Sequence, residues 1–194
     1  MKRYFYLLAS CAAVIGLVAT SALPRRPQLI WNASASVPVG LYAVHRQSGY
    51  HVGDLVAALP PEGVARVLAR GGYLPAGLPL IKYVAATAGQ RVCRSGVHIR
   101  VDGRMIGEAL LRDRWGRALP VWQGCRRLGA GQIFLMNARR PDSLDGRYFG
   151  AFARTTLLGR LTPILTDDGG HGHFAWHGLA RANPLCSNHE GSIS

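Results

Sequence analysis

The sequence predicts a mainly β protein with three parts: one N-terminal transmembrane helix, one antiparallel β domain and a disordered C-terminal tail. Residues 4–23 are an almost unbroken apolar run without a charge. Residues 27–165 contain short apolar segments separated by glycine-containing turns, a pattern typical of antiparallel sheets. From residue 166 to 194 the composition changes to Gly, His, Asn and Ser, which favours a flexible tail.

The apolar run of 20 residues is long enough to cross a bilayer as a helix. The basic start Met1-Lys2-Arg3 and the small residues just before Pro24 also fit a removable export signal, so anchor and signal both remain open. We favour a retained anchor because the run exceeds the usual length of a signal core. In either case the C-terminal portion leaves the cytoplasm.

Within the β domain, apolar segments bounded by turn residues predict strands. They cover residues 41–45, 54–59, 80–85, 97–101, 105–111, 132–137 and 148–152. Asp102-Gly103 is a strong signal for a two-residue hairpin. One short helix is expected over residues 61–70, ending at Gly71.

Of the four cysteines, two are candidates for a disulfide within the β domain. Cys11 lies in the apolar run and Cys186 lies in the polar tail, which leaves Cys93 and Cys125. A bridge between them would stabilise the fold by roughly 3 to 4 kcal/mol in an oxidising compartment. Two buried free thiols are the alternative.

The net charge of +13 raises the question of a nucleic-acid partner. The arginines are scattered from Arg3 to Arg181, without a basic helix, a zinc-finger spacing or a stacked-aromatic motif, so no nucleic-acid partner is expected. A basic exterior beside a bilayer is expected to attract anionic lipid head groups instead.

No cofactor and no metal are expected. The tail contains four histidines with loose spacing: His171, His173, His177 and His189. They lack carboxylate or cysteine partners at ligand spacing, which argues against a metal site.

Lys82 is the most informative single residue. Of the 23 basic residues 21 are arginine, and Lys82 is the only lysine outside the extreme N-terminus. A lysine can lose its proton when its surroundings disfavour charge, whereas an arginine cannot. Strand alternation places Lys82 beside Leu80 and Val84, and such a face could lower its pKa to the roughly 7 to 8 that suits a general base. The alternative is a lysine whose stem packs and whose ammonium reaches solvent.

A neutral lysine could activate a serine, and Ser36 is the best candidate because Pro38 and Gly40 force a bent, exposed backbone after it. The Ser34 hydroxyl would share the side of Ser36 in an extended backbone and could join the Ser36 amide in stabilising an oxyanion. The alternative is an Ala/Ser-rich linker beyond a membrane helix.

Three ordered segments together resemble the signal peptidase family of Ser/Lys proteases. These are Ser36-Val37-Pro38-Val39-Gly40-Leu41-Tyr42, then Leu80-Ile81-Lys82-Tyr83-Val84 with Ala88-Gly89-Gln90-Arg91-Val92, and finally Ser143-Leu144-Asp145-Gly146-Arg147-Tyr148-Phe149-Gly150. The stretch from Asn32 to Tyr42, with Pro-Val-Gly-Leu-Tyr shortly after the serine, is closer to the conjugative-transfer, TraF-type branch than to general signal peptidases. The match runs from about residue 32 to 152.

The resemblance implies an all-β catalytic fold with its apolar edge at the membrane. By this resemblance Ser36 is the nucleophile and Lys82 is the general base. Ser34 is an oxyanion donor, and Asp145 is a third catalytic residue. Ser143 would orient the lysine amine, and Asp145 would contact Arg147 in a charge-assisted pair that braces the site. A polar β-turn is the alternative interpretation of residues 143–147.

The chain departs from the family pattern at five positions: Val37, Tyr83, Gln90, Asn137 and Gly146. A basic residue usually follows the lysine, so Tyr83 leaves Asp145 without one expected cationic partner. Asn137 stands where Gly-Asp is frequent. None of these departures removes the nucleophile or the base.

The resemblance also implies a serine endopeptidase at the bacterial inner membrane, with its catalytic domain on the periplasmic side. Its substrate would be an exported, membrane-associated precursor; in the TraF-type branch this is a pilin subunit, which the enzyme can also cyclise. A general type I signal peptidase and a non-catalytic envelope component of a conjugation or secretion apparatus are the alternatives. A nucleic-acid-binding transfer protein would instead show affinity with a steep salt dependence.

Overall fold

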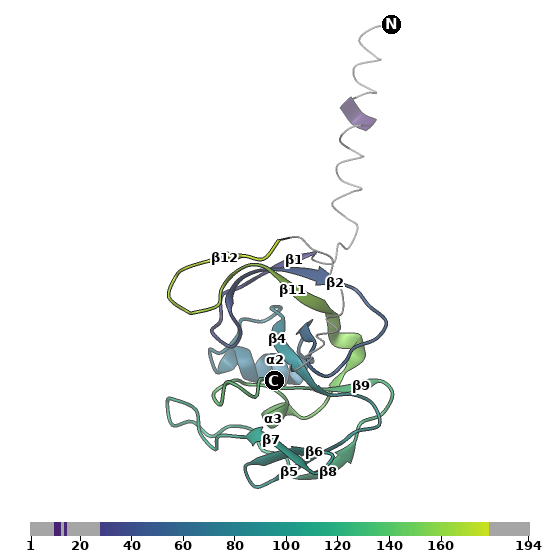
Figure 1. The fold of residues 1–194 in the computed structure, drawn as a ribbon, viewed down its shortest axis with the longest axis vertical. Coiled ribbons are helices and arrows are strands. Elements are labelled where there is room, and N and C mark those ends of the chain that lie inside the picture. Colours follow the sequence, from purple (N-terminus) through teal and green to yellow (C-terminus); the bar gives the residue numbers. More distant parts are fainter. Residues whose placement is uncertain (1–9, 13, 15–27, 179–194) are drawn as a thin grey trace, which may run out of the picture.

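The computed structural model describes residues 10–12, 14 and 28–178. Residues 28–178 form two antiparallel sheets and two short α-helices (Figure 1). In chain order the elements are β1 (Leu29–Asn32), β2 (Val39–His45), β3 (Leu55–Ala58), α2 (Glu62–Arg70), β4 (Leu80–Ala86), β5 (Arg91–Ser95), β6 (His98–Val101), β7 (Arg104–Glu108), β8 (Gly124–Arg127), β9 (Gln132–Leu135), α3 (Gly146–Phe149), β10 (Phe152–Ala153), the 3-10 helix η1 (Arg154–Thr156), β11 (Leu157–Asp167) and β12 (Ala175–Trp176). The described part of the chain is therefore mainly β, as predicted.

The larger sheet has the strand order β1-β2-β11-β3-β4-β9-β10, and β12 pairs with β11 at one side. Strand β4 lies inside this sheet, between β3 and β9. Leu80 and Val84 of β4 join one apolar cluster, whereas Ile81 and Tyr83 join another. The predicted alternation is therefore present, and it places Lys82 among the apolar side chains of the first cluster.

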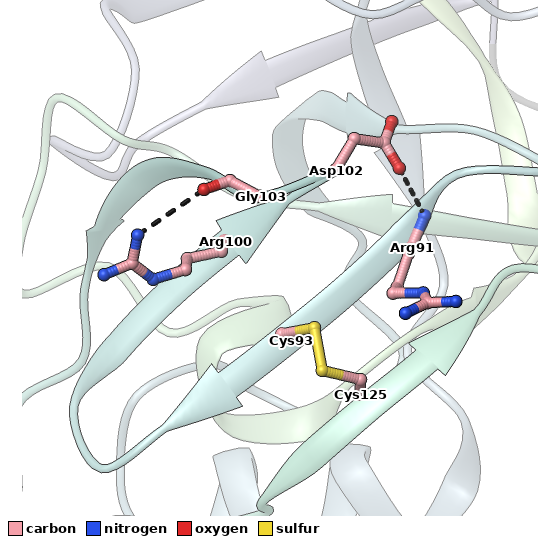
Figure 2. Close-up of a disulfide and its surroundings, with 6 residues drawn as sticks. All are labelled: Arg91, Cys93, Arg100, Asp102, Gly103 and Cys125. Carbon is pink, nitrogen blue, oxygen red and sulfur yellow. Dashed lines mark hydrogen bonds between the residues drawn. A yellow bond between two sulfur atoms is a disulfide. The ribbon is translucent and has the colours of Figure 1, made fainter.

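The smaller sheet has the order β7-β6-β5-β8 and lies at the opposite end of the molecule from β1 and β12 (Figure 1). Its β6–β7 hairpin turns at Asp102 and Gly103, whose φ angles of 47° and 83° are both positive, as the type I′ form of a two-residue hairpin loop requires. Cys93 of β5 lies directly opposite Cys125 of β8, and the two form a disulfide (Figure 2). The predicted pairing is confirmed, and both cysteines lie within strands.

One predicted strand is wrong. Residues 148–152 do not form one strand: α3 covers Gly146–Phe149, and β10 begins only at Phe152. The Asp145 carboxylate accepts a hydrogen bond from the Arg147 amide at 3.0 Å and thereby caps this helical turn, a contact that apolar patterning does not reveal.

Several strands lie outside the predicted segments: β1, β5, β8, β11 and β12. The longest of them, β11, was not indicated because Gly159 and Pro163 interrupt its pattern. The sheet accommodates these residues through register shifts against β3 and β2. The boundary predicted at residue 166 therefore falls inside β11, and β12 returns to pair with it.

Two predicted segments fall largely beyond the described residues. Of the apolar segment 4–23, only residues 10–12 and 14 are described, and these are helical. No helix in the described ranges is long and apolar enough to cross a membrane. Residues 179–194 of the predicted tail also lie outside the described part of the chain.

Candidate active site

Lys82 is buried in the larger sheet, with only 4% of its surface exposed. Its Nζ donates a hydrogen bond to Ser143 Oγ at 2.8 Å. Burial lowers the pKa of Lys82 to about 8; Asp145 opposes this shift, and Arg147 adds to it. A substantial fraction of the amine is therefore neutral slightly above neutral pH, which is what a general base needs.

Asp145 and Arg147, whose charges both act on Lys82, form a buried, bidentate ion pair. Arg147 Nε lies 2.9 Å from Asp145 Oδ1, and Arg147 Nη2 lies 2.9 Å from Asp145 Oδ2. The two side chains are 0% and 1% exposed. The guanidinium also donates to four backbone carbonyls: those of Glu108, Asn137, Arg140 and Ser143. Because each charge has a partner and further hydrogen bonds, the pair can hold residues 143–147 in one conformation.

The Tyr83 departure therefore does not leave Asp145 without a cation, because Arg147 binds both of its carboxylate oxygens. A second buried arginine supports the same turn: Arg94 of β5 is 1% exposed and donates to the Arg147 carbonyl. Sequence reasoning missed Arg94, and its local pattern offers no signal that could have found it.

Ser34 and Ser36 lie in the turn between β1 and β2, where Ser34 is exposed and Ser36 is half-buried. Their two hydroxyl oxygens are 3.0 Å apart. Gly40, which follows this turn, has a φ of 149°, and a Cβ there would lie 2.1 Å from the Leu165 carbonyl oxygen of β11. The glycine of the first sequence segment is therefore needed so that β2 and β11 can approach closely just beyond the serines.

Asn137 links the serine turn to the ion pair. Its side-chain amide donates to the Ser36 carbonyl, and its backbone amide donates to Asp145 Oδ2 at 2.9 Å. The preceding residue, Met136, donates to the Tyr83 carbonyl at 2.9 Å, which places Asn137 beside the Lys82 part of β4. The sequence had marked Asn137 only as a departure from the family pattern.

The structure thus brings all six predicted site residues into one connected group: Ser34, Ser36, Lys82, Ser143, Asp145 and Arg147. Within the described ranges, however, the Lys82 amine is hydrogen-bonded to Ser143 and the Ser36 hydroxyl to Ser34, not to each other. The described residues also contain no cluster of His, Cys, Asp or Glu that could hold a metal ion.

The chain belongs to the family described as signal peptidase, peptidase S26, which matches residues 1–165. The resemblance inferred from the three sequence segments is therefore confirmed.

Several proteins similar to this chain are named as conjugal or plasmid transfer proteins. The chain is 37% identical over 145 residues to a probable conjugal transfer protein TraF of Sinorhizobium fredii, covering 70% of this chain and 76% of that protein. It is 32% identical to a plasmid transfer protein TraF of Escherichia coli, covering 70% and 81%. A conjugal transfer protein TraF of Agrobacterium tumefaciens is 31% identical over 184 residues, covering 85% and 97%. Among solved structures, a signal peptidase I of Enterococcus faecalis matches with a TM-score of 0.37 and 18% identity, over 59% of this chain and 98% of that one.

Proposed function

We propose that this protein is a serine endopeptidase with a Ser/Lys dyad, in which Ser36 is the nucleophile and Lys82 the general base. The observation that carries the proposal is the buried Lys82 amine, whose pKa is lowered to about 8 and whose partners are connected to the serine turn. Burial without a carboxylate in direct contact is the physical condition that makes a lysine a base at moderate pH.

In the proposed reaction the Ser36 hydroxyl turns from Ser34 toward the neutral Lys82 amine and gives up its proton there. The Ser36 oxygen then bonds to the carbonyl carbon of the scissile peptide, and the carbonyl oxygen takes the negative charge. The Ser34 hydroxyl and the Ser36 amide would stabilise this oxyanion. Ser143 holds the amine in place, and the Asp145–Arg147 pair holds Ser143. The protonated lysine can then donate its proton to the leaving amine.

The proposed substrate is an exported, membrane-associated precursor, by analogy with the conjugal and plasmid transfer proteins TraF to which the chain is similar. A pilin subunit, matured by cleavage and in some cases cyclised, is the substrate that we favour. This proposal places the catalytic domain on the periplasmic side of the bacterial inner membrane, next to the bilayer that carries the precursor.

The test is processing of a pilin precursor in membranes that contain the full-length protein. We expect Ser36→Ala and Lys82→Met each to abolish processing while the protein remains folded, and Ser95→Ala, an exposed serine of the smaller sheet, to leave it unchanged. Unrelated secretory precursors, tested in parallel, separate the proposed activity from that of a general signal peptidase. Wild-type processing by the Ser36 or Lys82 variant would refute the assigned roles.

One observation favours a second candidate, a non-catalytic envelope component of a conjugation apparatus. Ser36 and Lys82 are hydrogen-bonded to other residues rather than to each other. Catalytic hydrogen bonds are often completed only when the substrate binds, so this geometry does not exclude catalysis. Trapping a covalent Ser36 acyl-enzyme would decide for the peptidase, whereas equal processing with and without Ser36 would decide for the second candidate.

A further inference from the structure

Asn32, the last residue of β1, is a polar side chain with 4% exposure and five hydrogen bonds to the serine turn. The two protons of its Nδ2 are shared among the carbonyls of Ser34 at 2.8 Å, Val37 at 3.1 Å and Pro38 at 3.0 Å. Its Oδ1 accepts from the Ser34 amide at 3.0 Å and from the Ser34 hydroxyl at 2.9 Å. The family resemblance extends to this residue but assigns it no role.

These partners determine which of the two terminal atoms of the Asn32 amide is the oxygen and which is the nitrogen. The Ser34 backbone N–H can only donate, so it requires the amide oxygen. The three carbonyls can only accept, so they require the NH2 group. A flipped amide would lose these bonds and bring oxygen against oxygen, so the orientation follows from the network itself.

The orientation of Asn32 sets the direction of the hydroxyl protons. The Ser34 hydroxyl has one proton, and it donates that proton to Asn32 Oδ1. In the 3.0 Å contact between the two serines, Ser34 is therefore the acceptor and Ser36 is the donor. The Ser36 proton thus points at Ser34 rather than at Lys82, and Ser34 has no free proton for an oxyanion.

We propose that Asn32 is a positioning residue that holds the two serines in a resting arrangement. In this arrangement the Ser36 hydroxyl donates its proton to Ser34, and the Ser34 hydroxyl donates its proton to Asn32. Both hydroxyl protons must turn away from these acceptors when the substrate reacts. This inference rests on the proposed peptidase function. On attack, the Ser36 proton moves to Lys82 Nζ, the Ser36 oxygen bonds to the substrate carbonyl carbon, and the carbonyl π electrons move to its oxygen. Ser34 then loses its incoming hydrogen bond, and its own proton turns from Asn32 to the new oxyanion.

The second hydrogen bond to Asn32 Oδ1 makes this rotation of the Ser34 hydroxyl feasible. When the Ser34 hydroxyl turns away, Oδ1 still accepts from the Ser34 amide at 3.0 Å. No buried acceptor is left unpaired, so the cost of the rotation is that of one hydrogen bond exchanged for a stronger one to an anion. The three Nδ2 bonds keep the turn in place meanwhile.

A double-mutant cycle tests the proposal against a purely structural role of Asn32. We expect Ser34→Ala and Asn32→Ala each to lower kcat by about 100-fold with little change in KM, as removal of one oxyanion donor does. The double variant should lose only a few-fold more than either single variant, because without Asn32 the Ser34 hydroxyl is no longer held beside Ser36, so both substitutions remove the same positioned donor. If Asn32 only holds the turn, the two losses multiply, and this result would overturn the proposal.

The pH profile gives a readout that does not depend on the size of the loss. In both single variants the midpoint of kcat/KM should remain near the Lys82 pKa of about 8. A midpoint that moves toward 10.5, the ordinary pKa of lysine, would mean that the substitution had changed the surroundings of Lys82, which would show that Asn32 is structural. Ser34→Thr, which retains a hydroxyl, should recover most of the activity lost in Ser34→Ala.

Neutron diffraction from crystals of the protein tests the same inference without activity. We expect deuterium on Ser34 Oγ directed at Asn32 Oδ1, and deuterium on Ser36 Oγ directed at Ser34. Deuterium on Ser34 Oγ directed at Ser36 would overturn the inference even in an active enzyme. The expected deuterium positions in an inactive protein would instead reject the proposed function and leave the hydroxyl arrangement standing.

Discussion

The two halves of the candidate site are built in opposite ways. The lysine half is buried and ionic: Lys82, Ser143, Asp145 and Arg147 are each at most 5% exposed, and a bidentate ion pair holds them. The serine half is a turn with an exposed Ser34 and a half-buried Ser36, and the neutral amides of two asparagines hold it.

This difference follows from what each half must do. A lysine becomes a base only where water is excluded, and an ion pair organises such a place strongly because little solvent screens it. A nucleophile must meet a substrate, so its turn stays open, and there an ion pair would contribute little. Neutral hydrogen bonds can direct a hydroxyl without adding a charge that would alter the pKa of the lysine.

Breaking the ionic half should have the largest effect on stability. Arg147→Ala leaves the Asp145 carboxylate buried without its partner, and we expect a loss of about 3 to 5 kcal/mol in the free energy of unfolding. The pKa of Lys82 should rise, because Arg147 lowers it and Asp145 raises it. Urea denaturation measures the loss. Arg140→Ala, whose ion pair with Asp142 is exposed at 3.6 Å, should cost less than about 1 kcal/mol; equal losses would contradict the contrast.

Removing the disulfide should lower the free energy of unfolding nearly as much as Arg147→Ala does, although it changes no residue of either half of the site. The bridge joins cysteines 32 residues apart in the smaller sheet, so Cys93→Ala with Cys125→Ala should lower the free energy of unfolding by roughly 3 to 4 kcal/mol. The pH midpoint of processing should not change. Denaturation of wild type with and without a thiol reductant is the parallel control, and a shifted midpoint would show that the smaller sheet acts on the lysine.

Burial of Lys82 should appear in the pH dependence of stability. Its pKa is about 8 when folded and 10.5 as the ordinary value, so the charged form is disfavoured in the folded state. The resulting penalty of about 3 kcal/mol is fully present below pH 8 and disappears as the pH rises toward 10.5. The unfolding free energy of wild type should therefore gain about this much relative to Lys82→Met across that window. Parallel curves for the two proteins would mean that the amine is not buried in solution.

The connection between the halves should give the smallest effect on stability. Asn137→Ala removes the side-chain hydrogen bond to the Ser36 carbonyl, and we expect a loss of about 1 to 2 kcal/mol together with a roughly tenfold lower kcat. The pH midpoint should remain near 8, because the amide carries no charge. Gln123→Ala removes an exposed amide that bonds to Gly96 and should change stability by less than about 0.5 kcal/mol. A shifted midpoint in the Asn137 variant would place this residue in the ionic half instead.

Local patterns in the sequence predicted several features correctly. The alternation of β4 placed Lys82 on an apolar face, and Asp102-Gly103 marked the hairpin, because strand periodicity and turn conformation depend on neighbouring residues. The disulfide could be predicted because only two cysteines remained once the apolar run and the tail were set aside. In contrast, β11 was missed because its glycine and proline are tolerated only through register shifts against other strands.

The sequence by itself determined which chemical groups this protein has. They are a single lysine in a strand of the β domain, two serines before a bent segment, and the carboxylate of Asp145 with the guanidinium of Arg147 in a third segment. Only the tertiary structure decided how they are used. Arg94 donates to the Arg147 carbonyl, Asn137 joins the two halves, and Asn32 directs the Ser34 proton. The physical reason is that burial, which sets the lysine pKa, and the direction of a hydrogen bond both depend on residues brought together from distant parts of the chain.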